Sequence, residues 1–273
     1  MKKIAVLLLA VLLGPIGWAQ GTKPQKAKID TLPDYALRTV TNRAFGVGEK
    51  LTYRVHYGFV DAGEAILEVK SSKAKFGGRD AYHIVGTGRS LGAFDWVFKV
   101  RDRYETYIDK QGIFPYRFIR DVNEGGYEIF QDYQFYPSKR ALRTHEKEEF
   151  ITPSFVQDLL SGFYFARTLD LSKVKVGDQF EITTFIDGEI YPLRIKYTGK
   201  ETIKLRNGKY RCMKFVPVIQ KGRIWKSEED LTVWITDDAN KIPILVKSEI
   251  LVGSIKMQMV EYSGLRNPIA RLE

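Results

Sequence analysis

The stretch VGEKLTYRVHYGF, residues 47–59, sets the pattern from which the fold can be inferred. From Leu51 to Phe59, bulky apolar side chains alternate with smaller or polar residues. Successive side chains of a strand point to opposite faces, so this period of two predicts a half-buried antiparallel strand. The alternation recurs at residues 94–100 and 193–197, and hairpin dipeptides separate such runs at Gly77-Gly78, Asp187-Gly188 and Asn207-Gly208. The chain is therefore predicted to be mainly β.

One segment departs from this pattern, the stretch TPSFVQDLLSGFYFARTL at residues 152–169. Its apolar residues recur at intervals of three and four, which is the spacing of a helix with one apolar face. Thr152 is the expected N-cap and Pro153 the expected first helical residue. We expect one central helix within residues 151–172, linking the two strand-rich regions.

The two strand-rich regions share landmarks in the same order. The pairs are Gly48 with Gly177, Gly78 with Gly208, and Pro115 with Pro243, which lie 129, 130 and 128 positions apart. Such constant spacing predicts an internal duplication, with one β-meander in residues 45–150 and a second in residues 173–273. The two repeats are expected to form one compact unit.

Each meander has an apolar face that must be buried against another layer. The meanders could pack face to face as a sandwich, or join edge to edge in one strongly curved sheet. We favour the curved antiparallel sheet or barrel-like fold, because the apolar stripe of the central helix suits a concave surface. The helix would then pack on or in the sheet.

The first residues indicate export. Residues 1–19 combine two lysines, a short apolar run and a small-residue cleavage site, as in a secretory signal peptide. Residues 20–44 are poor in large apolar side chains and are interpreted as a flexible N-terminal arm. No later stretch has the roughly 20 apolar residues of a membrane-spanning helix. The periplasm is the expected compartment, with secretion or outer-membrane association as alternatives.

Cysteine content and charge narrow the class of protein further. Cys212 is the only cysteine, so we expect neither an intramolecular disulfide nor a lipoprotein anchor on the mature N-terminus. The formal net charge is +10. Export makes nucleic acid an improbable partner, and the basic residues are scattered rather than clustered. A solvated basic surface is the simpler interpretation.

No catalytic, metal or cofactor site is expected. The motif GRSLG at residues 88–92 has the spacing of a nucleophilic serine turn around Ser90, but the following residues read as another strand where that motif needs a helix. The three histidines, His56, His83 and His145, are widely separated in the sequence. The adjacent carboxylates of residues 237 and 238 read as part of a turn rather than a glycosidase pair.

A non-catalytic ligand site is the remaining possibility. The candidate lining residues are aromatic: Tyr53, Trp96, Phe98, Phe155, Phe163 and Trp234. The alternative is that these rings simply fill a closed core. The polar residues Asp158, Ser161 and Arg167 of the helix are expected to satisfy caps and strand ends, with ligand contact as the alternative. A structure without a cavity of about 300 Å³ or more near the helix would exclude the interpretation of the protein as a lipid carrier.

Several stretches together resemble a known family. They are GEKLTYRVHYGFVDAGEAILEV, FDWVFKVRDRYETYID followed by FPYRF, QDLLSGFYFART, and LTVWITDDANKIPILVKSEILVGSIKMQM. In this order they are similar to the exported bacterial family called domain of unknown function 3108, over about residues 45–262. The resemblance implies an exported, β-rich envelope protein and supplies no catalytic residues.

Two classes of function follow. The first is a non-catalytic envelope protein that binds a hydrophobic or amphipathic ligand, such as a lipid, in a hollow of the curved sheet. The second is a structural or adaptor protein that binds another envelope protein. A hydrolase of envelope polymers ranks third.

Overall fold

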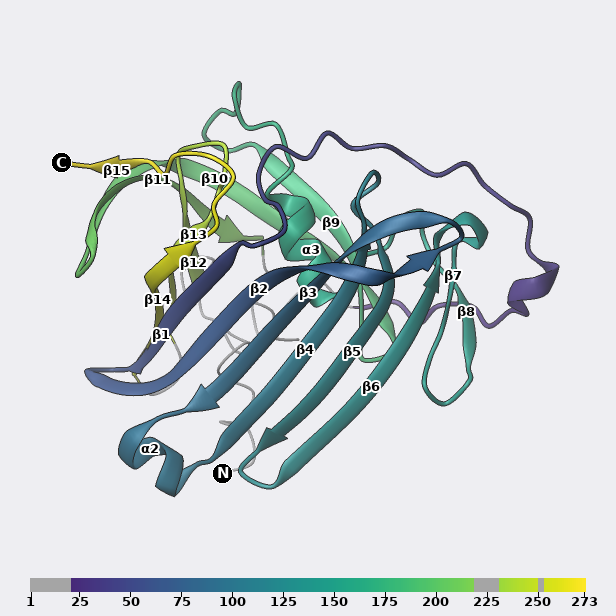
Figure 1. Ribbon diagram of the computed structural model, residues 1–273, viewed down its shortest axis with the longest axis horizontal. Coiled ribbons are helices and arrows are strands. Elements are labelled where there is room, and N and C mark those ends of the chain that lie inside the picture. The colour runs from purple at the N-terminus through teal and green to yellow at the C-terminus, as the bar shows by residue number, and fades with distance from the viewer. Residues whose placement is uncertain (1–20, 219–230, 250–252) are drawn as a thin grey trace.

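The structure is a computed structural model that describes residues 21–218, 231–249 and 253–273. The predicted signal peptide lies outside the described residues. One antiparallel sheet dominates, and its strands follow the order β8-β7-β6-β5-β4-β3-β2-β1-β14-β13-β12-β11-β10-β9. Figure 1 shows this sheet curling around, with β1–β6 in front and β9–β12 behind. The mainly β prediction is confirmed.

The first meander contains β1 (Lys50–Tyr57), β2 (Val60–Phe76), β3 (Arg79–Ser90), β4 (Val100–Asp109), β5 (Pro115–Glu124), β6 (Tyr127–Tyr136), β7 (Ala141–Arg143) and β8 (Glu149–Ile151). The second contains β9 (Gln179–Ile186), β10 (Glu189–Leu205), β11 (Gly208–Pro217), β12 (Leu231–Thr236), β13 (Pro243–Glu249) and β14 (Ser254–Ser263). A short β15 (Arg271–Leu272) pairs with β11. The helices are α2 (Gly92–Val97) and α3 (Leu159–Ala166), with two 3-10 turns at Ile29–Thr31 and Pro137–Lys139.

The meanders join edge to edge through an antiparallel pairing of β1 with β14. They therefore form one curved sheet, and the sandwich alternative is wrong. The meanders also match strand for strand at their starts. β2 and β10 each have 17 residues and begin 129 positions apart. The first residues of β3 and β11 are also 129 positions apart. This correspondence fits the predicted repeat, whose common origin stays a prediction.

The free edges of the sheet are bridged by connecting segments. Along the N-terminal arm, Thr22 pairs with Ile190 of β10 and Lys26 pairs with Phe150 of β8. Further along the chain, Gln157 pairs in parallel with Thr184 of β9. The arm also docks through Arg38, whose guanidinium donates to the carbonyls of residues 112 and 113 at 2.8 and 2.7 Å. These contacts dock parts of the arm on the sheet, whereas its flexibility stays a prediction.

Both helices differ from the sequence interpretation. Residues 92–97 form α2, so the strand expected over residues 94–100 begins only at Val100. The predicted central helix is also shorter than expected, with 8 residues in α3. It begins at Leu159, with Asp158 rather than Thr152 as its N-cap. Phe155, in the segment expected to be helical, has a φ of 55°, which is outside the right-handed helical region.

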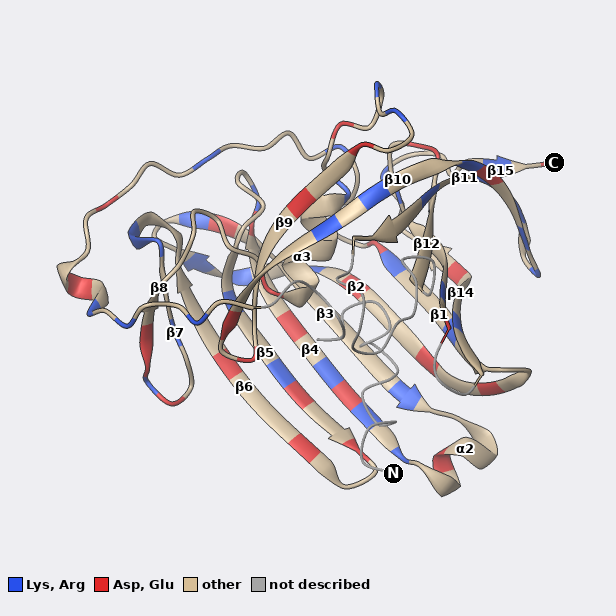
Figure 2. Cartoon of the chain, turned by 180° about the vertical axis from the view of Figure 1, so that it is seen from behind, with Lys and Arg blue, Asp and Glu red and all other residues tan. Residues whose placement is uncertain are grey.

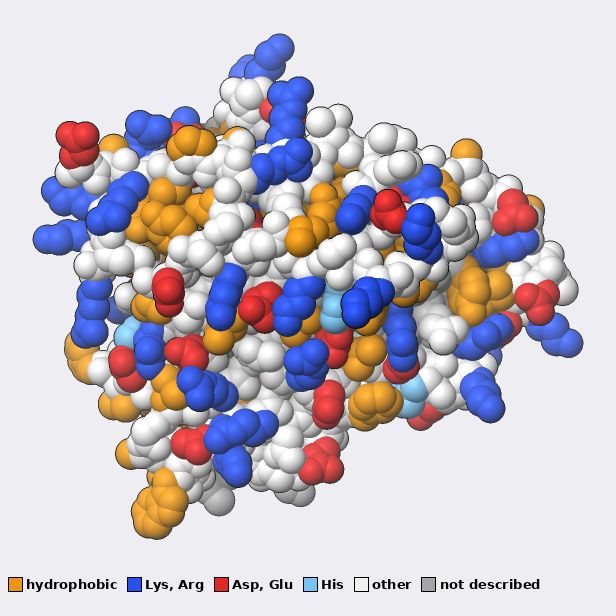
Figure 3. All heavy atoms as spheres, viewed as in Figure 1, with side chains coloured by type: hydrophobic (Ala, Val, Ile, Leu, Met, Phe, Trp, Pro, Cys, Tyr) orange, Lys and Arg blue, Asp and Glu red, His pale blue; other side chains and the backbone are white. Residues whose placement is uncertain are grey.

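The inner face of the sheet carries the core, and the outer face carries charge. Inward-facing apolar side chains such as Tyr53, Phe118 and Val246 are buried in one cluster that includes residues of both meanders. On the outer face, opposite charges pair across strands, as in Arg117 with Asp132 at 2.6 Å. Figure 3 shows positive and negative side chains interspersed over this face. Among the described helices, none is long and apolar enough to span a membrane.

A candidate ligand-binding hollow beside helix α3

An apolar hollow lies between α3 and the second meander. Its volume is about 140 Å³. The lining side chains include Leu159, Phe163 and Ala166 from α3, Phe180, Ile182 and Ile186 from β9, Leu193 and Ile195 from β10, Phe215 from β11, and Leu231, Val233 and Ile235 from β12. Several of them, such as Phe163 and Val233, are only half-buried. The hollow is therefore open to solvent.

Helix α3 is fixed in place by a buried cap. The Asp158 carboxylate accepts the Ser161 N–H at 2.9 Å, and the Ser161 hydroxyl in turn accepts the Asp158 N–H at 2.8 Å. The Thr106 hydroxyl of β4 donates to the same carboxylate at 2.7 Å. Burial raises the pKa of Asp158 to about 6. This capping box anchors the helix to the first meander while its other side faces the second.

Close packing brings α3 against β9. A methyl group placed at Gly162 would lie 3.5 Å from Thr184 and 3.7 Å from Ile182, which is ordinary contact distance. Gly162 of α3 therefore lies directly against these two residues of β9. The space of the hollow lies beside this contact.

Two cationic residues line the hollow, Arg167 and Lys241. Arg167 follows α3 and is buried, and its guanidinium donates to both Glu49 oxygens at 2.7 Å. Its Nε also donates to the Asn240 carbonyl at 2.9 Å. Asp158 and Ser161 therefore cap the helix, and Arg167 makes a buried ion pair.

The candidate aromatic residues do not gather at one site. Only Phe163 lines the hollow. Trp234 lies between Val233 and Ile235, which both face the hollow, so its ring points the other way. Its indole N–H donates to Glu201 at 2.7 Å. Trp96 is 93% exposed, because it lies on α2 and not on a strand.

The other candidate rings lie elsewhere in the fold. Tyr53 is buried on the inner face of β1, and burial raises the pKa of its hydroxyl. Phe98 packs against the turn at Gly125, and Phe155 packs on Phe114 with ring centroids 5.4 Å apart. Sequence reasoning missed the aliphatic residues of β9, β10 and β12, although the alternation at residues 193–197 signalled one of these strands.

Ser90 has a structural role. A helix does follow it, contrary to the expectation of a strand. Its side chain is nevertheless buried, donates to Asp95 at 2.5 Å and accepts the Val100 N–H at 2.8 Å. His83 lies seven residues away on the same extended strand, too far to act on Ser90, and contacts Glu105 at 2.5 Å. The serine hydroxyl thus fixes the start of β4.

The acidic pair at residues 237 and 238 also has separate structural partners. Asp237 accepts from Lys200 at 2.8 Å, whereas Asp238 accepts backbone N–H groups of its own turn. In the described part of the chain, no group of three or more His, Cys, Asp or Glu residues could hold a metal ion.

A second polar feature lies on the inner wall of the first meander. Asp102 and Glu124 are both buried there, and burial followed by their mutual repulsion raises the pKa of Glu124. Nearby, Arg120 donates to Asp187 at 3.0 Å. Because Asp187 belongs to the β9–β10 turn, this contact ties the tip of that hairpin to β5 across the inside of the sheet.

Comparison with known proteins places the chain in a family. A structure from Brucella abortus, described as a beta-barrel-like protein of the domain of unknown function DUF1849, is similar with a TM-score of 0.52 and 11% identity, covering 84% of this chain and 99% of that one. A DUF1089 family protein from Pseudomonas aeruginosa has a TM-score of 0.38 and 10% identity, covering 66% and 87%. The Brucella structure shares this fold. The TM-score of the Pseudomonas structure is below 0.5, so no shared fold is inferred from it. No curated protein matched. The family model described as protein of unknown function DUF3108 matches residues 52–260, and this chain belongs to that family.

Proposed function

We propose that this protein is a non-catalytic envelope protein whose hollow binds the apolar part of an amphipathic ligand. The observation that carries the proposal is the lining of the hollow, which is almost entirely aliphatic and aromatic and remains open to solvent. Exposed apolar surface of this kind costs free energy in water, and a bound alkyl chain would remove it from solvent.

The size of the hollow limits the ligand. At about 140 Å³ it falls short of the 300 Å³ expected for a lipid carrier, so it is too small to enclose a whole lipid. An engineered apolar cavity of about 150 Å³ binds a molecule the size of benzene. We infer that one narrow chain end enters here. Burying four or five methylene groups would contribute about 3–4 kcal/mol.

Native mass spectrometry of residues 20–273 purified from a bacterial periplasm tests the proposal, followed by organic extraction of any bound species. A retained acyl-chain species of defined mass is the supporting result. V233W fills the hollow and should abolish the bound species. V260W is the matched control, because Val260 on β14 is 36% exposed and does not line the hollow. Equal ligand loss in both variants, or an apo mass that stays unchanged with added envelope lipids, refutes the proposal.

A specific observation favours the adaptor function as the second candidate. Large apolar side chains are exposed on neighbouring turns at one end of the sheet, where Phe59 is fully exposed and Trp96 and Val97 are 93% and 80% exposed. Figure 1 shows α2 and the β1–β2 turn at this end. A protein partner would cover these side chains. Crosslinking in cells should capture one defined protein that F59A/W96A loses and V233W retains.

Export to the periplasm is part of the proposed function. It rests on the leader-like residues 1–19. Cell fractionation with N-terminal sequencing tests it, and the expected product begins at Gln20 in the periplasmic fraction. A full-length cytoplasmic product would contradict this localisation.

A further inference from the structure

We propose that the ligand of the hollow is an anionic single-chain amphiphile, and that Lys241 binds its carboxylate head group. This inference rests on the proposed function and names the chemistry of the ligand. Of the two cationic residues in the lining, Arg167 is already neutralised by Glu49. Lys241 is the one whose charge lacks such a partner.

The hydrogen bonds of Lys241 leave donors free for a ligand. Its ammonium group donates to the Arg167 carbonyl at 3.2 Å. Among the residues that the structure describes, no carboxylate oxygen lies within 4 Å of this nitrogen, although Asp170 and Asp238 lie close enough to influence it. An ammonium group has three N–H donors, so two remain for an anion.

Partial burial makes an anionic partner favourable at this position. Lys241 is half-buried beside apolar side chains of the hollow. Removal from water lowers its pKa below the ordinary value. A charge withdrawn from water is stabilised when a counter-charge accepts its hydrogen bonds, and a charge-assisted bond is stronger than a neutral one.

The turn that presents Lys241 is built rigidly. The Asp238 carboxylate accepts the backbone N–H groups of Asn240 at 2.8 Å and Lys241 at 3.2 Å. The Asn240 side chain is held in turn by the C-terminal segment, where it donates to the carbonyl of Asn267 at 3.0 Å. Lys241 itself has a φ of 49°, in the left-handed region that a lysine seldom adopts. These bonds hold a strained residue at a fixed point beside the hollow.

A carboxylate suits both the size and the charge of this site. The end of one alkyl chain enters the hollow, and one compact anion satisfies a single ammonium group. Decanoate and 1-decanol share the same chain and differ in the head group. They therefore separate the contribution of the charge from that of the chain.

Isothermal titration calorimetry of the mature chain with these two probes tests the inference. Wild type should bind decanoate at least about tenfold more tightly than decanol, which is the ratio expected of one charge-assisted hydrogen bond. K241Q should remove this preference and leave decanol binding unchanged. K247Q on β13 is the matched control and should keep the preference, because Lys247 pairs with Glu249 and does not line the hollow.

Each outcome bears on a different claim. Equal binding of decanoate and decanol by wild type, or a preference that survives in K241Q, overturns the role of Lys241 but leaves the apolar hollow standing. Binding of neither probe overturns the proposed function itself. If K241Q fails to fold, K241R decides the matter, because it retains the positive charge and should keep a preference for decanoate that K241M loses.

Discussion

The buried ion pair of Arg167 and Glu49 joins the end of α3 to the residue before β1. Their side chains are 3% and 0% exposed, so removing one partner would strand the other charge in the core. We predict that R167M lowers the free energy of unfolding by about 3–5 kcal/mol. Urea denaturation measures it. R194Q is the control, because Arg194 and Glu181 are 51% and 46% exposed, and should cost less than about 1 kcal/mol. Equal losses would contradict the prediction.

The carboxyl group of Glu124 should make stability depend on pH. Burial, and then the neighbouring Asp102, raise its pKa above the ordinary value of 4.5. Above that value the folded state therefore holds more protons than the unfolded state, so the free energy of unfolding falls as the pH rises. E124Q cannot ionise, and we predict a shallower fall between about pH 5 and about pH 8.

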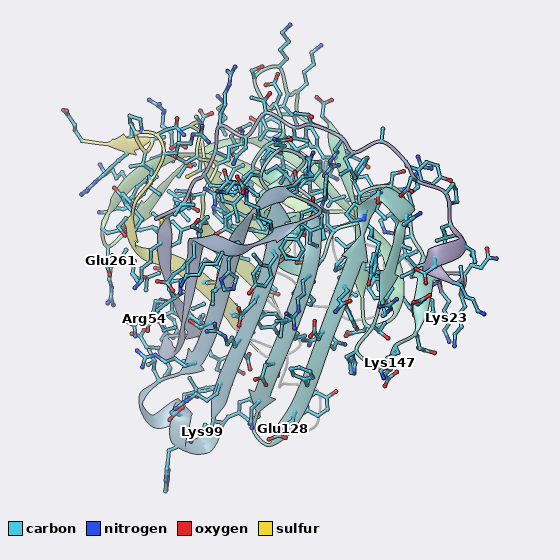
Figure 4. All side chains as sticks on the ribbon, turned by 45° about the vertical axis from the view of Figure 1, so that its right-hand side comes forward. Lys23, Arg54, Lys99, Glu128, Lys147 and Glu261 are labelled. Carbon is cyan, nitrogen blue, oxygen red and sulfur yellow. The ribbon has the colours of Figure 1, made fainter. Side chains whose placement is uncertain are left out.

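Urea titrations at a series of pH values measure this slope, and E128Q supplies the control. Glu128 is exposed on β6, and Figure 4 shows it near the end of the sheet. E128Q should keep the wild-type slope. A slope that is the same in wild type and E124Q would mean that Glu124 is ionised in the folded protein.

The start of α3 provides a test of which residue caps the helix. The Asp158 carboxylate accepts hydrogen bonds from the Ser161 N–H and the Thr106 hydroxyl. Thr152 lies six residues before this cap. We predict that D158A lowers the free energy of unfolding by about 2–4 kcal/mol, because it removes the cap and leaves a buried hydroxyl unpaired. T152A should cost about 1 kcal/mol or less. Thermal and urea unfolding measure both variants, and a larger loss in T152A would contradict the assignment.

The elements were predictable where one local pattern dominates. Leu51 to Tyr57 alternate cleanly and form β1. The spacing of two between Phe94 and Trp96 imitated a strand, although α2 is a helix of 6 residues. A helix this short has too few turns to show its own period. Thr152 and Pro153 likewise imitated a helix start, because a cap signal does not reveal which of several polar residues is used.

The site was harder to predict than the sheet, because it depends on contacts between distant elements. The hollow combines α3 with five strands of the second meander, β9 to β13. Which face of β12 points inward depends on its pairing with the neighbouring strands, and the register of β12 with β13 shifts between Trp234 and Ile235. The sequence therefore predicted the concave surface but assigned Trp234 to the wrong side of it. Lys241 was missed because its turn resembles any polar loop.

The curved sheet as a whole should open along the line between β8 and β9. Strand pairing does not close this seam directly. The N-terminal arm spans it, since the Ile151 N–H donates to Gln25 at 2.8 Å and the Ile190 N–H donates to Thr22 at 2.9 Å. A chain that begins at residue 29 lacks both acceptors. Local opening should therefore become easier at the seam and remain unchanged in the middle of the sheet.

Hydrogen exchange followed by mass spectrometry or NMR compares this shortened chain with residues 20–273. We expect faster exchange at Ile151 and Ile190, because their acceptors are gone. The β2–β3 ladder, where Leu67 pairs with Gly86 far from the seam, should keep its protection. Uniform acceleration across both regions would mean that the arm stabilises the whole fold cooperatively. Unchanged exchange at Ile151 and Ile190 would mean that the arm does not hold the seam in solution, and either result contradicts the prediction.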